Sequence, residues 1–368
     1  MGLPDEALGD VPGEWRRTRE YLIRHRHGLT AVADRLYPDL PKVGRLLSRP
    51  EWLPAEPLEL SELALSWRRP PPSHEIDGTE PAAQPLLSGF ASYAEALGSL
   101  APPAIFENRS SYRLLHADLT AKEMEFAPGS YFDGMNVGES AAHELAAAVM
   151  RGTEPYSLPF RKLVGDPCDL RRRTVVPAIS TLTIRYDRVG GRASFILHWR
   201  DPAKVAHGGG LYQVMPVGIF QPSADSPANE TNDFDLWRCM VREFSEELLG
   251  ESEDHGNGPG ALDYDRWPLY RRLASARQAG LLTVHCLGLG VDPLTFAADL
   301  LTVAVFDSGT FDEIFAGLVG TNAEGRVVGG IPFTEDSIGP FVRGAEPIQA
   351  AGSAVLDLAW RNRAGLLH

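Results

Sequence analysis

Three carboxylates on one predicted helix give the clearest indication of chemistry. The segment LWRCMVREFSEELLG contains Glu243, Glu246 and Glu247, with Arg242 directly before them. On an α-helix over residues 235–249 these positions, spaced i, i+3 and i+4, lie on one face. Like charges at this spacing destabilise a helix, and a divalent cation such as Mg²⁺ or Mn²⁺, which prefers oxygen ligands, would offset the repulsion. We therefore expect a metal site here, with Arg242 orienting one carboxylate; the alternative is a solvated acidic helix face.

The predicted helix needs a sheet against which it can pack. Its apolar stripe would make that contact and consists of Leu236, Cys239, Met240 and Phe244. Three extended runs precede the helix, at residues 179–187, 192–199 and 211–222. The first two alternate apolar and polar residues and are joined by a turn containing Gly-Gly, which is typical of a β-hairpin. A polar loop over residues 223–233 leads from the third run into the helix, and Gly250 is a suitable C-cap.

The whole chain limits the possible functions. Its 368 residues, 43% hydrophobic, are enough for two domains with buried cores. The formal net charge of −14 disfavours direct electrostatic binding to nucleic acid or to an anionic membrane. Three widely separated cysteines favour neither a disulfide framework nor a zinc site, and no apolar run reaches the length of about 18 residues that a membrane span needs. These features predict a soluble cytoplasmic protein.

The composition and residue patterns along the chain predict three regions. Residues 1–85 contain a predicted helix over 14–36 with several arginines, followed by a Pro-rich linker. Residues 86–170 contain two strands and an Ala-rich helix, which predict a small α+β accessory region. Residues 171–368 contain the strands and the glutamate helix. The predicted fold class is α/β (α+β), with a mixed sheet in the C-terminal half and a smaller N-terminal α+β region.

The segment 242–247, Arg-Glu-Phe-Ser-Glu-Glu, resembles the helical half of the signature of Nudix hydrolases, which runs Arg-Glu-apolar-any-Glu-Glu. The hairpin over 179–200 is similar to the family's opening strands, and YQVMPVGIF is similar to the strand that enters its signature loop. Residues 277–307 resemble two further strands, and residues 349–363 resemble the closing helix. The resemblance covers about half of the chain, from Thr174 to the end.

This resemblance implies a Nudix-like α/β/α sandwich that hydrolyses a nucleotide-like substrate in which a nucleoside diphosphate is linked to another group. It implies that Mg²⁺ or Mn²⁺ binds Glu243, Glu246 and Glu247. It also implies that Glu246, Glu247 or a later loop residue, Glu324, activates water. The candidate substrate contacts are Arg185, His198, Arg200 and Gly218. Each of these single residues has the alternative of an ordinary surface or structural role.

Two signature positions differ from the family pattern. A glycine and a glutamate usually precede the signature arginine by fourteen and eight residues, and these positions hold Ala228 and Phe234. The alternative function is therefore a Nudix-like domain without catalysis, which binds a nucleotide-like ligand as a sensor or as a component of a transcriptional regulator. Its ligand occupancy would be transmitted to the N-terminal half or to a partner.

The N-terminal half carries a second resemblance. The run FENRSSYRLLHADLTAKEMEFAPGSYFDGMNVGESAAHELA is similar to segments of actinobacterial proteins catalogued as helix-turn-helix regulators. The basic helix at residues 16–26 lacks a partner helix with a turn glycine at the required spacing, so DNA binding by this chain is disfavoured. The aromatic residues of this half would suit a core or an interface equally, and a homodimer is one way to bury them.

Overall fold

A computed structural model describes residues 10–103, 106–152, 155–200, 210–251, 260–321 and 325–368. It confirms the predicted mixed α/β class. In these ranges ten strands form one sheet, in which β12 and β7 are parallel and the other pairs are antiparallel. Across the sheet the main order is β1 (Lys42–Val43), β2 (Leu46–Leu47), β11 (Leu282–Val291), β12 (Ala298–Asp307), β7 (Pro177–Asp187), β8 (Arg192–Arg200) and β13 (Gly325–Pro332). Three short strands pair beside this path: β3 (Leu58–Glu59) on β11, β9 (Tyr212–Val214) on β8, and β10 (Val217–Ile219) on β7.

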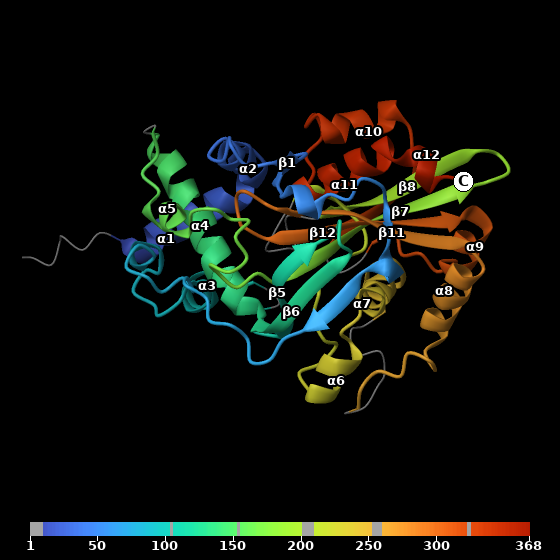
Figure 1. Cartoon of the computed structure of the whole chain (residues 1–368). Coiled ribbons are helices and arrows are strands. Elements are labelled where there is room, and N and C mark those ends of the chain that lie inside the picture. The colour runs from blue at the N-terminus through green and yellow to red at the C-terminus, as the bar shows by residue number, and fades with distance from the viewer. Residues whose placement is uncertain (1–9, 104–105, 153–154, 201–209, 252–259, 322–324) are drawn as a thin grey trace, which may run out of the picture.

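Helices cover both faces of this large sheet, as Figure 1 shows for α11 (Ala350–Arg361) on one side and α7 (Leu236–Glu243) on the other. Alternation along the strands sends successive side chains to opposite faces. Leu182, Ile184, Leu301 and Val303 pack in the same core as Val355 of α11. The intervening positions lie in the other core, with Ile179, Leu300 and Phe306 beside Met240 and Phe244. The predicted apolar stripe of the glutamate helix is therefore confirmed.

Further helices complete the two layers around the large sheet. On the α11 side lie α10 (Glu335–Val342) and α12 (Arg363–Leu366). The remaining helices of the C-terminal region are α6 (Pro227–Asn232), α8 (Pro268–Gln278) and α9 (Ser308–Ile314). The loop predicted over residues 223–233 thus contains a short helix, which Ser226 caps by accepting a hydrogen bond from the backbone N–H of Asn229.

The N-terminal half contributes a second, smaller sheet. Its order is β4 (Ala64–Trp67), β6 (Glu123–Ser130) and β5 (Ser110–Asp118), so the two strands predicted after residue 86 are confirmed. The helices of this half are α1 (Val11–Arg24), α2 (Arg26–Asp34), α3 (Tyr93–Leu100), α4 (Tyr131–Arg151) and α5 (Pro159–Val164). Strands β1, β2 and β3 also come from before residue 86, yet they join the large sheet. The division at residues 85 and 170 stays a prediction.

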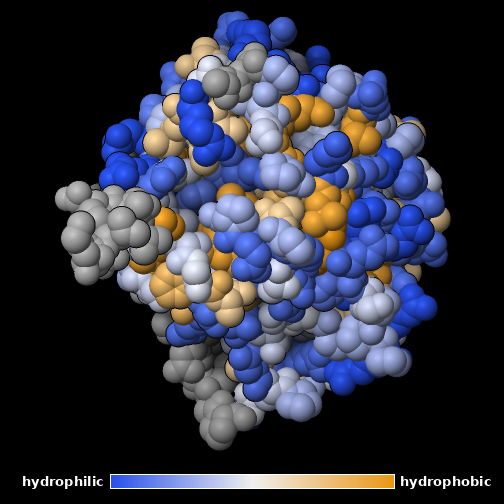
Figure 2. All heavy atoms as spheres, turned by 90° about the vertical axis from the view of Figure 1, so that its left-hand side faces the viewer, coloured by the Kyte–Doolittle hydropathy of each residue, from blue (hydrophilic) through white to orange (hydrophobic). Residues whose placement is uncertain are grey.

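The arginines of the predicted N-terminal helix are only partly exposed to solvent. The predicted continuous helix over 14–36 is interrupted at His25, where α1 ends and α2 begins. Arg16 and Arg17 are exposed as expected, but Arg19 is buried against α4, where its guanidinium donates to the carboxylate of Glu139. The surface on this side of the molecule is mainly hydrophilic, with apolar residues in small groups (Figure 2). Among the described helices, none is long and apolar enough to cross a membrane.

Replacing either of two glycines of α4 by alanine is expected to have opposite effects on stability. A Cβ atom at Gly138 would lie 2.1 Å from the carbonyl oxygen of Thr295, so Gly138→Ala forces the loop after β11 away from the helix. We expect a loss of about 1–3 kcal/mol in the free energy of unfolding. At Gly134 the nearest atom would lie 3.7 Å away, and Gly134→Ala is expected to gain about 0.5–1 kcal/mol from helix propensity. Urea unfolding of both variants checks this, and equal effects would contradict the close approach at Gly138.

Candidate active site on the glutamate helix

The helix that carries the glutamates changes its hydrogen-bond pattern halfway. It begins as an α-helix with Asp235 as N-cap, whose carboxylate accepts from the backbone N–H of Arg238 at 3.0 Å. From Phe244 to Leu248 it continues as a π-helix, so the prediction of a regular α-helix over residues 235–249 is wrong for this turn. A π-turn widens the helix and rotates the following side chains, and such turns are frequent at functional sites. The three glutamates therefore lie across the junction between the α-helical and the π-helical turns.

Strand β10 receives two of the three carboxylates. A Cβ atom at Gly218 would lie 1.9 Å from the carboxylate of Glu243, which shows that Glu243 lies directly over the bare backbone of this glycine. One carboxylate oxygen of Glu247 accepts a hydrogen bond from the backbone N–H of Val217 at 3.2 Å. Both side chains are only partly exposed. The sequence predicted Gly218 as a substrate contact, and the structure places it against Glu243 because β10 packs on α7.

Glu243 and Glu246 line a small pocket of about 20 Å³. Two arginines, Arg109 and Arg242, lie in the same wall, and the remaining lining residues are Gln221, Pro222 and Ser223. Roughly 10–15 Å³ is needed for one water molecule, so the pocket has room for a single water or ion. Carboxylates beside such a space can bind a cation, and guanidinium groups can bind a phosphate oxygen that approaches it from outside.

Arg109 joins this pocket from the other half of the chain. It lies just before β5 and donates a hydrogen bond to the carbonyl oxygen of Ser223 at 3.1 Å. A neighbouring contact fixes the same loop, since Asp225 accepts from the backbone N–H of Ser110 at 2.9 Å. The residues between β10 and α7 are therefore attached to the small sheet.

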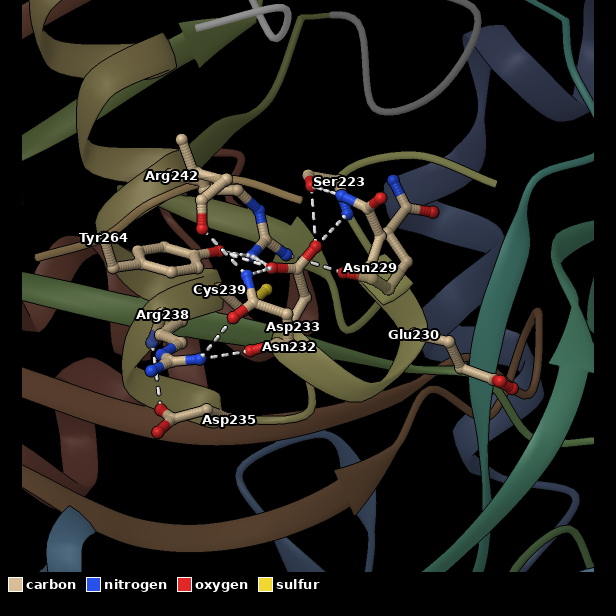
Figure 3. Close-up of polar contacts among 12 residues, drawn as sticks. Ser223, Asn229, Glu230, Asn232, Asp233, Asp235, Arg238, Cys239, Arg242 and Tyr264 are labelled. Carbon is tan, nitrogen blue, oxygen red and sulfur yellow. Dashed lines mark hydrogen bonds and ion pairs between the residues drawn. The ribbon is translucent and has the colours of Figure 1, made fainter. Parts of the chain in front are cut away.

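Arg242 is the centre of a buried polar network (Figure 3). Its guanidinium donates to the Tyr264 hydroxyl at 2.5 Å and to the Gln221 carbonyl at 2.6 Å, and it lies 3.8 Å from the carboxylate of Asp233. Asp233 in turn accepts from Tyr264 at 2.8 Å and from the Ser223 hydroxyl at 2.6 Å. The sequence predicted that Arg242 orients a carboxylate, and the carboxylate found at this distance is Asp233.

The network keeps Arg242 charged although it is only 4% exposed. Burial by itself would lower the pKa of the guanidinium, but the hydrogen-bonded Tyr264 and the carboxylate of Asp233 raise it above its ordinary value. Burial also raises the pKa of the Cys239 thiol to about 12, so this cysteine is inert as a nucleophile. Arg242 is therefore a fixed positive charge at the base of the pocket.

The other predicted substrate contacts lie elsewhere on the sheet. Arg185 follows Ile179, the partner of Gly218, by six residues along β7, which is about 20 Å of strand. There its guanidinium pairs with Asp312 of α9 at 2.5 Å. His198 is buried on β8 opposite Gln213, and Arg200 ends the same strand.

These positions decide the outcome for one predicted substrate contact and leave two others open. Arg185 is not brought to the glutamates, and an ion pair on α9 accounts for it. For His198 and Arg200 a contact with substrate stays a prediction. The predicted base Glu324 lies outside the described residues.

The metal prediction can be compared with these positions. In the part of the chain that the structure describes, no group of three or more His, Cys, Asp or Glu side chains is arranged to hold a metal ion. Magnesium is often held by one or two carboxylates together with substrate phosphates. Glu243 and Glu246, which share one ion-sized pocket, fit this arrangement of two carboxylates completed by substrate phosphates.

Known proteins provide no further guide to this site. The chain matches no protein-family model, and no curated protein matches it. The similarity of residues 242–247 to a hydrolase signature therefore stays a prediction, and the geometry of the pocket carries the functional argument.

Proposed function

We propose that this protein hydrolyses a phosphoanhydride bond in a nucleoside diphosphate-linked substrate, in the manner of a divergent Nudix hydrolase that uses Mg²⁺ or Mn²⁺. The observation that carries the proposal is the pocket in which Glu243 and Glu246 face Arg109 and Arg242. Carboxylates suit the divalent cation, and guanidinium groups suit the phosphate oxygens that arrive with it.

Each side chain then has a defined role. Glu243 and Glu246 would hold the cation, and Arg109 would bind a phosphate oxygen at the rim. When bound, the cation supplies charge neutralisation to the diphosphate and to the leaving phosphate. Glu247, kept beside β10 by the Val217 N–H, would accept the proton of the water that attacks phosphorus. Arg242 would supply a fixed positive charge in the wall of the pocket, since its guanidinium is held by Tyr264 and Gln221.

A product screen tests the proposal. The purified protein is incubated with Mg²⁺ and nucleoside diphosphate sugars, dinucleotides or nucleoside triphosphates, beside Glu246→Gln and Glu247→Gln. We expect turnover of one class, reduced by about 100-fold or more in each variant. Glu335→Gln, an exposed glutamate in the first turn of α10, is the matched control and should keep the activity. Turnover that survives both active-site substitutions would contradict the assignment.

A second candidate function is a ligand sensor without catalysis, and Phe234 favours it. At this position, where the Nudix signature has a glutamate, the phenyl ring packs in an aromatic cluster. Its ring centroid lies 5.0 Å from that of Trp67, 5.1 Å from Tyr112 and 5.9 Å from Phe220. The loop before α7 is thus joined to the small sheet, and occupancy of the pocket would be communicated to the N-terminal half. The same screen separates the functions, because a sensor is thermally stabilised by a nucleotide that it does not turn over.

A further inference from the structure

A second cavity lies between the N-terminal helices and α11. It has a volume of about 80 Å³, which is room for roughly five to eight water-sized groups. Segments far apart in the sequence form its walls: α2, the loop between β11 and β12, and the residues around the start of α11. Such a cavity between segments, with several charged side chains in its walls, is a typical place for a small ligand.

One wall of the cavity is positively charged. Arg26 and Arg45 line it together with His27, whose ring nitrogen lies 3.4 Å from the Arg45 guanidinium. Burial and the charge of Arg45 lower the pKa of His27, so the arginines provide the charge. Arg26 also lies 3.8 Å from the carboxylate of Glu139, which leaves Arg45 as the main positive group. Gly344 makes room for one of them, since a Cβ atom there would lie 2.5 Å from Arg45 Nη2.

The start of α11 adds to this positive wall. Gln349 stands at the N-cap, but its side chain accepts from Gln213 at 3.3 Å, and no side-chain cap is found on this helix in the described ranges. Ala350 and Ala351, the first helical residues, line the cavity. Backbone N–H groups at a helix start carry partial positive charge and bind anions such as carboxylate or phosphate.

A buried carboxylate lies in the same cavity. Asp299 of β12 is 8% exposed and accepts a hydrogen bond from the Ser180 hydroxyl at 2.7 Å through one oxygen, Oδ1. Burial, together with the negative charge of Asp292, which also lines the cavity, raises its pKa to about 7, although the hydrogen bond from Ser180 opposes this rise. A carboxylate in such a place gains from a cationic partner, because a buried charge without one is costly.

We propose that this cavity binds a small zwitterion of the amino-acid class. Its carboxylate would contact Arg26, Arg45 and the start of α11, and its ammonium group would contact Asp299. Groups of both signs in one cavity select a ligand that carries both signs. The volume of about 80 Å³ has room for a ligand as small as an amino acid.

The cavity is separate from the proposed active site. Ser180 and Asp299 precede Leu182 and Leu301 by two residues on their strands and share their face, which α11 covers. Glu243 and Glu246 lie with α7 on the opposite face. Binding here therefore does not depend on the proposed hydrolysis.

Thermal unfolding of the full chain tests this inference. The common amino acids are added one at a time to the protein and to Asp299→Asn, Arg45→Met and Glu346→Gln. We expect one amino acid, or a chemically related few, to raise Tm by several degrees when present at about 100 times Kd. The shift should vanish in Asp299→Asn and Arg45→Met and persist in Glu346→Gln, an exposed neighbour of the cavity.

Analogues of the active amino acid test the requirement for both charges. The corresponding amine without the carboxylate, and the acid without the amine, are expected to give at most a small part of the shift. An equal shift with either analogue would overturn the zwitterion assignment. The inference also fails if no amino acid raises Tm, or if the shift survives in both cavity variants. Tm without ligand reports whether each variant is folded, and Arg45→Met remains informative if Asp299→Asn does not fold.

Discussion

Asp233→Ala is expected to lower the free energy of unfolding by about 3–5 kcal/mol, because it leaves the buried charge of Arg242 without its carboxylate. Asp233 is fully buried and accepts hydrogen bonds from the backbone N–H and the hydroxyl of Ser223, at 2.8 and 2.6 Å, and from Tyr264 at 2.8 Å. Its removal would release the loop before α7 as well as the arginine. Urea unfolding followed by circular dichroism measures the loss.

The matched control is Asp235→Ala, two residues further along the same loop. Asp235 caps α7 through the N–H of Arg238 and is only partly buried, so its loss should cost about 1 kcal/mol. Two losses of equal size would contradict the central role of the network in Figure 3. A large loss for Asp233→Ala alone would show that this network fixes the base of the pocket.

Gly218→Ala is expected to weaken binding of Mn²⁺ by about 10- to 100-fold while changing stability little. The new Cβ would lie 1.9 Å from the carboxylate of Glu243, which must turn away from β10. This carboxylate ends a flexible side chain, so its displacement costs little folding energy but removes one proposed ligand from the pocket. Titration with Mn²⁺ followed by electron paramagnetic resonance measures the affinity.

Two variants accompany this measurement. Gly329→Ala, also within a strand, would place its Cβ 3.5 Å from the nearest atom of Ile196, an ordinary contact, and should leave Mn²⁺ binding unchanged. Glu243→Gln should reproduce the loss seen in Gly218→Ala, since both remove the same carboxylate. Unchanged affinity in Gly218→Ala would exclude Glu243 as a ligand. Absence of Mn²⁺ binding in the unsubstituted protein would contradict the metal-dependent hydrolysis itself.

Much of the scaffold around the pocket could be predicted from local patterns. The alternation in residues 179–199 predicted the hairpin of β7 and β8, and the apolar stripe predicted the face of α7 that packs on the sheet. These features depend on neighbours within a few residues, where side-chain period and turn chemistry decide the conformation. Asp235 also marks the start of α7 by its type and position.

The partners of the glutamates could not be predicted in this way. Arg109 reaches the loop of Ser223 across a separation of 114 residues, and Tyr264 reaches Arg242 across 22. The one available signal was the residue type, since a buried arginine needs acceptors around it. Nothing in the local sequence indicates which acceptors those are.

By itself, then, the sequence determined the class of the fold, the main strands and the helix that presents Glu243, Glu246 and Glu247. Only the tertiary structure decided that this helix ends in a π-turn and that Gly218 lies under Glu243. It also decided that a second cavity, lined by both arginines and carboxylates, lies on the opposite face of the sheet. The physical reason is the range of the interactions. Hydrophobic periodicity acts within one element, whereas pockets form where elements distant in the chain are packed together.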